Sequence, residues 1–155
     1  MKLGITGSRT ITDFDFAQYF QLKNADFAAF LKKLGFTSIS KIISGGASGV
    51  DSLAEGCANR ISIPILRVDP DFEKYHGRMR FAAFGDRDEK IVEQADAMLV
   101  IWNGDISSHG TLYTMNAAIE DGLPVYMVKA QDGQILWEGV QTEIIEYPRR
   151  KRWKN

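Results

Sequence analysis

The chain has one cysteine, Cys57, among its 155 residues, so it cannot form an internal disulfide. Its two histidines belong to no Cys/His cluster with metal-site spacing, and we expect neither a metal nor a cofactor. No apolar run is long enough to cross a membrane, and the N-terminal residues lack the apolar core of a signal peptide. These absences lead us to expect a cytoplasmic protein with no membrane partner.

Clustered positive charge is scarce outside the last seven residues. That segment, RRKRWKN, holds five of the 19 lysines and arginines, which leaves 14 basic against 20 acidic residues, a net charge of −6. Nucleic-acid binding needs cations that contact phosphates, so this acidic body argues against nucleic acid as the principal ligand. We interpret residues 148–155 as a solvated basic tail, with phosphate contact by the tail as the alternative.

The remaining composition is that of a globular protein, with 45% hydrophobic and 25% charged residues. No repeat, low-complexity tract or linker divides the sequence, and we predict one domain over residues 1–147. Apolar runs alternate with helical patterns, which indicates an α/β fold with three layers and a mostly parallel sheet. The predicted strands cover 2–6, 41–44, 63–69, 97–102 and 124–129, and the predicted helices 26–36, 48–59, 86–95 and 111–121.

Three further features complete the predicted fold. The helix at 86–95 has an acid-rich first turn, as the helix dipole favours. Residues 133–148 alternate around a turn at Glu138-Gly139, which indicates an edge hairpin or a loose strand pair. Residues 10–22 form either a short helix or a lid, and their aromatic residues favour a place in the core.

Glycine-rich polar loops follow three of the predicted strands. In an open parallel sheet, ligands bind beyond the carboxyl ends of the strands where the winding reverses. A strand order of 3-2-1-4-5 places the first and fourth loops on either side of that crevice and the second loop beside it. The candidate residues of the three loops are Gly7, Ser8 and Arg9; Ser44, Gly45, Gly46, Ala47, Ser48 and Gly49; and Ser108, His109, Gly110 and Thr111.

Loops of this kind suit a phosphate group. Without Cβ atoms, the backbone lets a phosphate oxygen approach its N–H groups, and the following helix adds unpaired N–H donors. Arg9 supplies a cation suited to bidentate contact, while His109 is either a ligand contact and acid or base, or a polar loop residue. The alternative for Gly45, Gly46 and Gly49 is a tight turn that lets the helix lie close to the sheet.

The stretches GSRTITD, IISGGASGVDSLAEGCA, DRDEKIVEQADAMLVIWNG and SSHGTLYTMNAAIEDGLPV resemble the SLOG superfamily in order and spacing. The resemblance covers residues 1–129 and is greatest to the YspA/YpsA-related branch of small bacterial and phage proteins. It implies a Rossmann-like fold with a pocket for a nucleotide or nucleotide-sugar, such as a ligand derived from ADP-ribose or NAD. It also implies that Asp51, and Arg87 of an Arg-Asp pair, join the loop residues in that pocket.

Two relatives within the superfamily suggest different functions. The LOG enzymes cleave the N-glycosidic bond of nucleoside monophosphates with an arginine and a glutamate, but here Thr114 stands at the glutamate position. Loss of that carboxylate removes the nearest stabiliser of an oxocarbenium-like transition state. The DNA-processing relative has an arginine where this chain has Ser48, and the acidic body weakens that interpretation.

The sequence therefore supports three hypotheses. The first is a module that binds a nucleotide-type small molecule, as a sensor, carrier or sequestering protein. The second is a nucleotide N-glycosidase, and the third is a nucleic-acid accessory protein that uses the basic tail. The SLOG resemblance further implies a homo-oligomer.

Overall fold

Six strands form one sheet in the order β3-β2-β1-β4-β5-β6. All neighbouring strands are parallel except β5 and β6, which are antiparallel. The computed structural model describes residues 1–148 and residue 152. The strands are β1 (Lys2–Gly7), β2 (Lys41–Ser44), β3 (Ile65–Arg67), β4 (Ala97–Trp102), β5 (Val125–Gln131) and β6 (Gln134–Val140). The helices are α1 (Ala17–Phe20), α2 (Ala25–Lys33), α3 (Val50–Arg60), the 3-10 helix η1 (Gly77–Met79), α4 (Arg80–Gln94) and α5 (His109–Glu120).

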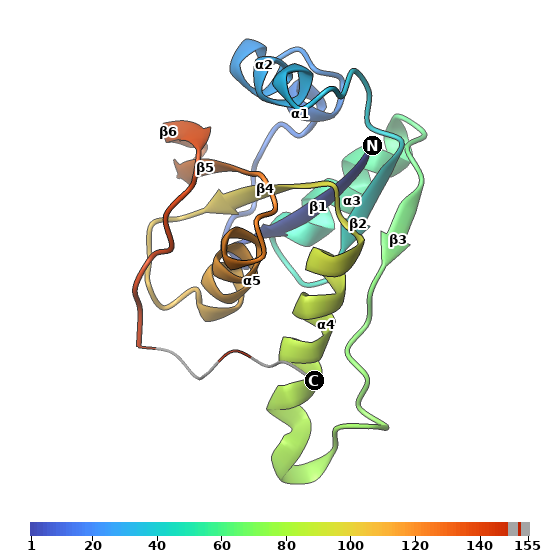
Figure 1. Cartoon of the computed structure of the whole chain (residues 1–155), viewed down its shortest axis with the longest axis vertical. Coiled ribbons are helices and arrows are strands. Elements are labelled where there is room, and N and C mark those ends of the chain that lie inside the picture. Colours follow the sequence, from blue (N-terminus) through green and yellow to red (C-terminus); the bar gives the residue numbers. More distant parts are fainter. Residues whose placement is uncertain (149–151, 153–155) are drawn as a thin grey trace.

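The helices cover the sheet on both faces, which confirms the predicted Rossmann-like three-layer α/β fold (Figure 1). One apolar core joins α1, α2 and α3 to the sheet through residues such as Phe27, Leu31 and Ala54. The other joins α4 and α5 to it through residues such as Ile91 and Leu112. Within the described residues, no helix has both the length and the apolar character that crossing a membrane requires.

Strand β4 lies in the middle of the sheet and all six of its residues are buried, as expected for a parallel strand covered on both faces. It pairs with β1 over five residues, from Leu3 opposite Ala97 to Gly7 opposite Ile101. The chain winds from β1 toward β3 on one side of this pair and from β4 toward β6 on the other. The loops after β1 and β4 therefore separate at the point where open sheets bind ligands.

Helix α4 differs from its predicted limits. It begins at Arg80 rather than at residue 86, because Ala82 and Ala83 are buried and continue its apolar face. Its first turn contains no acid, so the predicted acid-rich first turn is wrong. Asp86, Arg87 and Asp88 instead lie within the helix and are buried, which places ionisable side chains between α4 and its neighbours.

The turn expected at Glu138-Gly139 lies instead at Asp132-Gly133, and residues 134–140 form one continuous edge strand. Asp132 and Gly133 have φ angles of 51° and 77°, the two positive values that a tight hairpin turn with the strand twist requires. Glu138 stays in the strand because its Oε1 accepts hydrogen bonds from Tyr19, Asn24 and Tyr126.

The homo-oligomer that the SLOG resemblance implies stays a prediction.

Residues 10–22 fold onto the body of the protein. Only Ala17–Phe20 are helical, and Phe16, Tyr19 and Phe20 are buried in the core, as predicted for these aromatic residues. Tyr19 packs edge-on against Phe27 of α2 with ring centroids 5.4 Å apart. This segment is therefore a part of the core rather than a lid.

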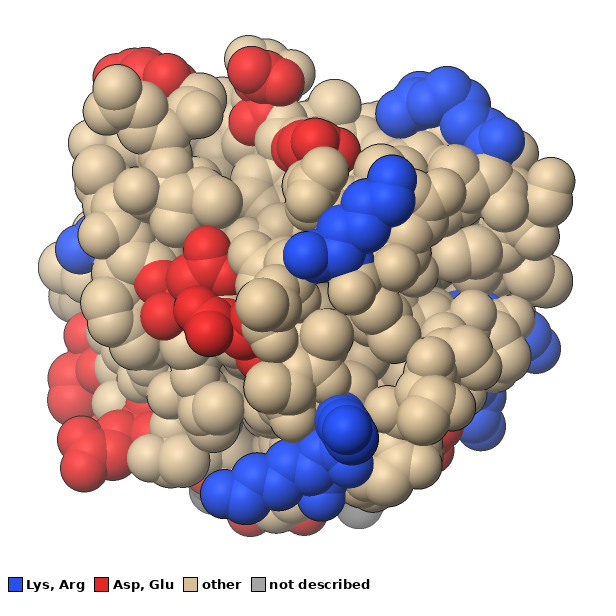
Figure 2. Space-filling view, turned by 90° about the horizontal axis from the view of Figure 1, so that it is seen from above, with Lys and Arg blue, Asp and Glu red and all other residues tan. Residues whose placement is uncertain are grey.

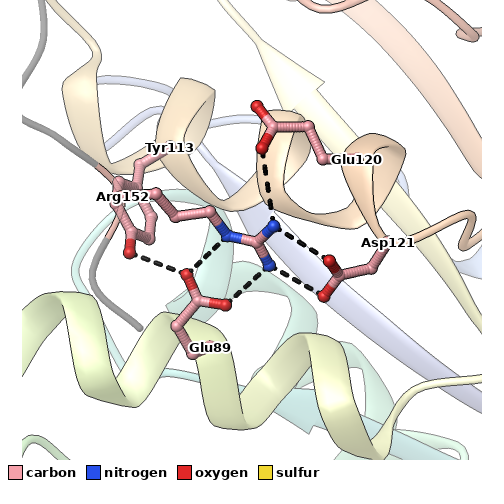
Figure 3. Close-up of polar contacts among 5 residues, drawn as sticks. All are labelled: Glu89, Tyr113, Glu120, Asp121 and Arg152. Carbon is pink, nitrogen blue, oxygen red and sulfur yellow. Dashed lines mark hydrogen bonds and ion pairs between the residues drawn. The ribbon is translucent and has the colours of Figure 1, made fainter. Parts of the chain in front are cut away.

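The C-terminal segment returns over α4 and α5. Asn116 of α5 accepts a hydrogen bond from the backbone N–H of Ile145 and donates one to its carbonyl, both at 3.0 Å. Arg152 then lies among Glu89, Glu120 and Asp121, with its side chain only 10% exposed (Figure 3). This contact corrects the prediction of a solvated tail for Arg152. The other basic tail residues, 149–151 and 154, lie outside the described residues.

Candidate functional site

A cavity of about 370 Å³ opens at the carboxyl ends of β1 and β4, where the strand order reverses. Its size is within the range of small-molecule sites. The loops after β1 and β4, the start of α3, the middle of α4 and the first turn of α5 all contribute to it. Its lining comprises Ile5, Thr6, Gly7, Arg9, Thr10, Ala47, Asp51, Arg87, Asp88, Ile91, Asn103, Asp105, Ser107, Ser108, His109, Gly110 and Thr111.

The loop after β1 is held against the loop after β4 by Ser8. The Ser8 hydroxyl is buried and accepts a hydrogen bond from the Asn103 N–H at 3.0 Å, and it lies 3.3 Å from the Ser108 hydroxyl. Ser8 is therefore a positioning residue that does not line the cavity. Arg9 follows it, is exposed at the cavity, and makes no ion pair with any described residue.

Helix α5 directs its first turn at the cavity through Gly110 and Thr111. Its N-cap residue, Ser108, makes no capping hydrogen bond, because its hydroxyl donates to the Asn103 side chain at 3.2 Å. The first N–H groups of a helix have no partner within the helix, and they carry the positive end of its dipole. The uncapped first turn of α5 is thus suited to an anionic group.

The Ser44–Gly49 loop cradles a carboxylate that belongs to the protein. The Ala47 N–H donates to Asp51 Oδ2 at 3.1 Å, and the Gly46 N–H donates to the Ser44 hydroxyl at 3.1 Å. The Ser44 hydroxyl in turn donates to Glu55 at 3.0 Å. The amides that the sequence suggested for a phosphate are therefore partly used to fix Asp51 at the start of α3.

The glycines of this loop leave room for arginine side chains and for a second loop. A Cβ on Gly45 would lie 2.7 Å from an Arg87 nitrogen, and one on Gly46 would overlap the Arg67 guanidinium. A Cβ on Gly49 would overlap the backbone of Arg9, which brings the loops after β1 and β2 together. Six of the predicted site residues do not line the cavity: Ser8, Ser44, Gly45, Gly46, Ser48 and Gly49.

Two buried aspartates and one arginine form the floor of the cavity. The Arg87 Nε donates to Asp88 Oδ1 at 2.7 Å, and an Arg87 terminal nitrogen donates to the Gly45 carbonyl at 2.7 Å. Asp51, on α3, lies near the same arginine, whose positive charge opposes the rise in the Asp51 pKa that burial causes. Arg87 thus connects α4 to the loop after β2 and lies between the two carboxyl groups.

Burial raises the pKa of both Asp51 and Asp88 to about 6. For Asp51, desolvation is offset in part by the Ala47 N–H and the Arg87 charge, while Glu55 raises the value further. For Asp88, the charge of Arg87 and its hydrogen bond oppose desolvation, and a contact with Thr114 lowers the pKa slightly. Both groups therefore change protonation close to physiological pH, as acids and bases in enzyme sites do.

The loop after β4 adds polar groups that were not among the predicted site residues. Asn103 accepts the N–H of Asp105 at 2.9 Å and also contacts Thr10, which orders the cavity rim. The Ser107 N–H binds Asp105 at 2.8 Å, and this hydrogen bond lowers the pKa of the Asp105 carboxyl. The sequence signal that could have identified these loop residues was their position directly after a fully buried strand.

His109 lies at the edge of the cavity and is exposed. Its ring is 5.4 Å from that of Tyr147 in the C-terminal segment. Across residues 1–148 and 152, no three His, Cys, Asp or Glu side chains come together as metal ligands. The chemistry of the cavity therefore depends on Arg9, the first turn of α5, and the Asp51–Arg87–Asp88 group.

A search of solved structures finds DNA processing protein A (DprA) from Streptococcus pneumoniae, with a TM-score of 0.53 and 19% identity. The match covers 85% of this chain and 52% of DprA, so this chain spans about half the length of that protein. Likeness at this identity supports the shared Rossmann-like fold, and the YspA branch of the SLOG superfamily stays a prediction. No family model and no curated protein matches the sequence.

The visible surface charge differs from that of a nucleic-acid groove. Figure 2 shows lysines and arginines in separate groups on one face, with acidic residues gathered elsewhere on it and broad uncharged areas between them. Among the described residues of this face, no continuous basic stripe follows a path for a phosphate backbone. At 19% identity, the structural likeness to DprA shows the fold alone.

Proposed function

We propose that this protein binds a nucleotide-type small molecule, a phosphate-bearing nucleotide or nucleotide-sugar, in the cavity between β1 and β4. The observation that supports this most directly is the meeting of Arg9, which has no carboxylate partner among the described residues, with the uncapped first turn of α5. Arginine and helix N-terminal amides both bind phosphate oxygens. A role as a sensor, carrier or sequestering protein follows from binding alone.

The rest of the lining suits the uncharged part of such a ligand. Ile5 and Ile91 offer apolar surface, while Asn103, Thr111 and the aspartates offer hydrogen-bonding groups. A site with one cationic region and several acceptors matches a molecule that joins a phosphate to a hydroxyl-bearing sugar. A simple inorganic anion would leave the carboxylates of the lining without a hydrogen-bond donor from the ligand.

Thermal unfolding with added AMP, ADP-ribose or NAD tests this function. We expect at least one of these probes to raise the Tm, because a ligand at 100 times its Kd stabilises by about 2.7 kcal/mol. Arg9→Ala should abolish that increase without lowering the ligand-free Tm, since Arg9 is exposed and makes no ion pair with described residues.

Arg78→Ala is the matched control, because Arg78 is also exposed but does not line the cavity. It should retain the full increase in Tm. The proposal fails if none of the three probes changes the Tm of the unmodified protein, or if Arg9→Ala responds to them as the unmodified protein does.

A nucleotide N-glycosidase is the second candidate, favoured by the two buried carboxyl groups with pKa values of about 6. Such groups can donate or accept a proton near neutral pH. Thr114, at the position of the LOG glutamate, instead donates its hydroxyl to the Gly110 carbonyl at 2.9 Å. Release of free base from AMP or NAD over hours, measured by chromatography, would establish the enzyme; its absence with retained binding supports the binding module.

A further inference from the structure

One carboxylate oxygen in the cavity floor has no hydrogen-bond partner. Asp51 is only 7% exposed and lines the cavity. Its Oδ2 accepts the Ala47 N–H, whereas its Oδ1 is buried and accepts nothing from any described residue. No other buried side-chain nitrogen or oxygen of the described residues lacks a partner. A buried acceptor left unpaired costs about 1–3 kcal/mol, and more if it is charged.

Several of the surrounding donors are directed elsewhere, while the Gly45 N–H lies near enough to Asp51 to lower the pKa of its carboxyl. Two nitrogens of Arg87 bind Asp88 and the Gly45 carbonyl, and the Ser44 hydroxyl binds Glu55. The Ala47 amide is held by the other oxygen of the same carboxyl group. The fold therefore fixes the orientation of Asp51 through Oδ2 and leaves Oδ1 to a group that enters the cavity.

The missing partner must be a hydrogen-bond donor. A phosphate oxygen is an acceptor and would be repelled by an ionised carboxylate, so the phosphate of the ligand belongs at Arg9 and the first turn of α5. The groups of a nucleotide that donate are its sugar hydroxyls and its base N–H groups. A carboxylate accepts readily from sugar hydroxyls, as acidic residues do from the ribose of dinucleotides in related α/β folds.

We propose that Asp51 Oδ1 accepts a hydrogen bond from a sugar hydroxyl of the ligand, so that the site selects a phosphorylated sugar over its deoxy counterpart. This inference rests on the proposed function and adds the part of the ligand that is recognised. A charge-assisted hydrogen bond in a buried site gives discrimination of about tenfold or more.

Because the charge-assisted form of this hydrogen bond requires the ionised carboxylate, the discrimination depends on pH. Arg87, Glu55 and Asp88 are the charged groups that act on Asp51, and its pKa of about 6 leaves it ionised at pH 7.5 and protonated at pH 5. The lining also contains Arg9, Asp105 and His109. A phosphate probe titrates near pH 6 itself, so the quantity to measure is a ratio between two probes that carry the same phosphate.

The experiment compares AMP with 2′,3′-dideoxy-AMP by isothermal titration calorimetry. At pH 7.5 we expect AMP to bind at least tenfold more tightly, and at pH 5 we expect the ratio to fall below threefold. Asp51→Asn should reduce the ratio at pH 7.5 in the same way, because its carboxamide oxygen can keep the Ala47 N–H and leave an NH₂ group in the place of Oδ1. Glu93→Gln, which changes an exposed carboxyl of α4 that does not line the cavity, should keep the ratio.

The outcomes separate the two proposals. Equal binding of AMP and 2′,3′-dideoxy-AMP overturns the role of Asp51 and leaves the proposed function intact. An unchanged ratio in Asp51→Asn overturns it too. Binding of neither probe overturns the inference, and the proposed function fails with it if ADP-ribose and NAD also leave the Tm unchanged. Retained binding of 2′,3′-dideoxy-AMP by Asp51→Asn shows that the variant is folded, so a lost ratio is then due to the missing acceptor.

Discussion

Arg87 belongs to helix α4 and Arg152 packs against the same helix, and both lie among carboxylates, but the two groups of charges are completed in different ways. Around Arg152, Glu89 and Asp121 each bind the guanidinium through both carboxylate oxygens, with contacts of 2.7–2.9 Å (Figure 3). Tyr113 adds a hydrogen bond to Glu89 at 2.7 Å. The guanidinium itself connects α4, the end of α5 and the C-terminal segment.

Around Arg87, by contrast, the protein leaves one carboxylate oxygen unpaired beside an open cavity. Burial raises the pKa of both aspartates there, whereas the carboxylates around Arg152 raise the pKa of the arginine itself. A fully paired cluster stabilises a packing arrangement, while a partly paired and desolvated one stores free energy that a ligand can recover. The comparison therefore separates a structural cluster from a candidate functional one.

Replacing Arg87 should have the largest effect on stability. Arg87→Met leaves Asp51 and Asp88 buried without a cation, and loss of one partner of a buried ion pair costs about 3–5 kcal/mol. The loss in unfolding free energy at pH 7 should shrink at pH 5, because the two carboxyl groups are then neutral. Urea unfolding of the variant and of the unmodified protein at both pH values measures this loss in unfolding free energy.

A second change tests whether the uncompensated charge is the cause. In the double variant Arg87→Met/Asp88→Asn, one of the two buried carboxylates is removed, so we expect part of the lost stability to return at pH 7. If the single variant is equally destabilised at pH 5 and pH 7, packing of the Arg87 side chain, rather than charge, accounts for the loss.

Replacing Arg152 should have an intermediate effect. Arg152→Ala removes two bidentate pairs but exposes the remaining carboxylates to water more readily, so we expect a loss of about 1–3 kcal/mol. Thermal unfolding measures this loss, and ligand affinity should change little because none of the cluster lines the cavity. Glu120→Gln is the matched control: its contact with Arg152 is 3.5 Å long and should contribute less than about 0.5 kcal/mol.

Of the Arg87, Arg152 and Asp51 replacements, that of Asp51 should have the smallest effect on stability, and its sign is opposite to that of the other two. Its folded pKa of about 6 lies above the unfolded value of about 3.9, so the folded state binds more protons between these values. The unfolding free energy from this group consequently falls as the pH rises from about 4 to about 6. Asp51→Asn should be more stable than the unmodified protein by about 1–2 kcal/mol at pH 7 and equally stable at pH 4.

Asp105→Asn should change the stability at pH 7 in the opposite direction from Asp51→Asn. The pKa of Asp105 is lowered by its hydrogen bond from Ser107, so its ionised form stabilises the folded state, and this contribution is lost as the pH falls through the folded pKa. The variant should therefore be less stable than the unmodified protein at pH 7. If Asp51→Asn is also less stable at pH 7, Asp51 contributes to stability as the Arg152 cluster does, and the comparison between the clusters fails.

Much of the fold followed from local sequence patterns. The apolar runs at Ile42–Ile43 and Ala97–Trp102 predicted buried parallel strands, and their alternation with helical segments predicted the strand order and the position of the crevice. The prediction of a turn at Glu138-Gly139 was wrong because Glu138 has partners on α1, at the N-cap of α2 and on β5 that a local pattern does not reveal. Asp132-Gly133, with the typical residues of a hairpin turn, was the stronger local signal.

The sequence predicted where the site lies better than it predicted the chemistry of the site. The loops after β1 and β4 were expected beside the crevice, and residues such as Arg9 and His109 do line it. The Ser44–Gly49 loop was expected to cradle a ligand, but its Ala47 amide holds Asp51 and its glycines make room for Arg67 and Arg87. The composition of a loop shows that its backbone is accessible, and it does not show which group approaches that backbone.

By itself, the sequence determined the alternation of strands and helices, the reversal of strand order, and the edge of the sheet where polar loops gather, because these depend on periodicity and chain connection. The tertiary structure alone decided which charges meet. Arg152 reaches Glu89 across 63 positions of the chain, and Arg87 reaches Gly45 across 42. Contacts over such separations depend on how the layers pack, and that packing left one oxygen of Asp51 for a group from outside the protein.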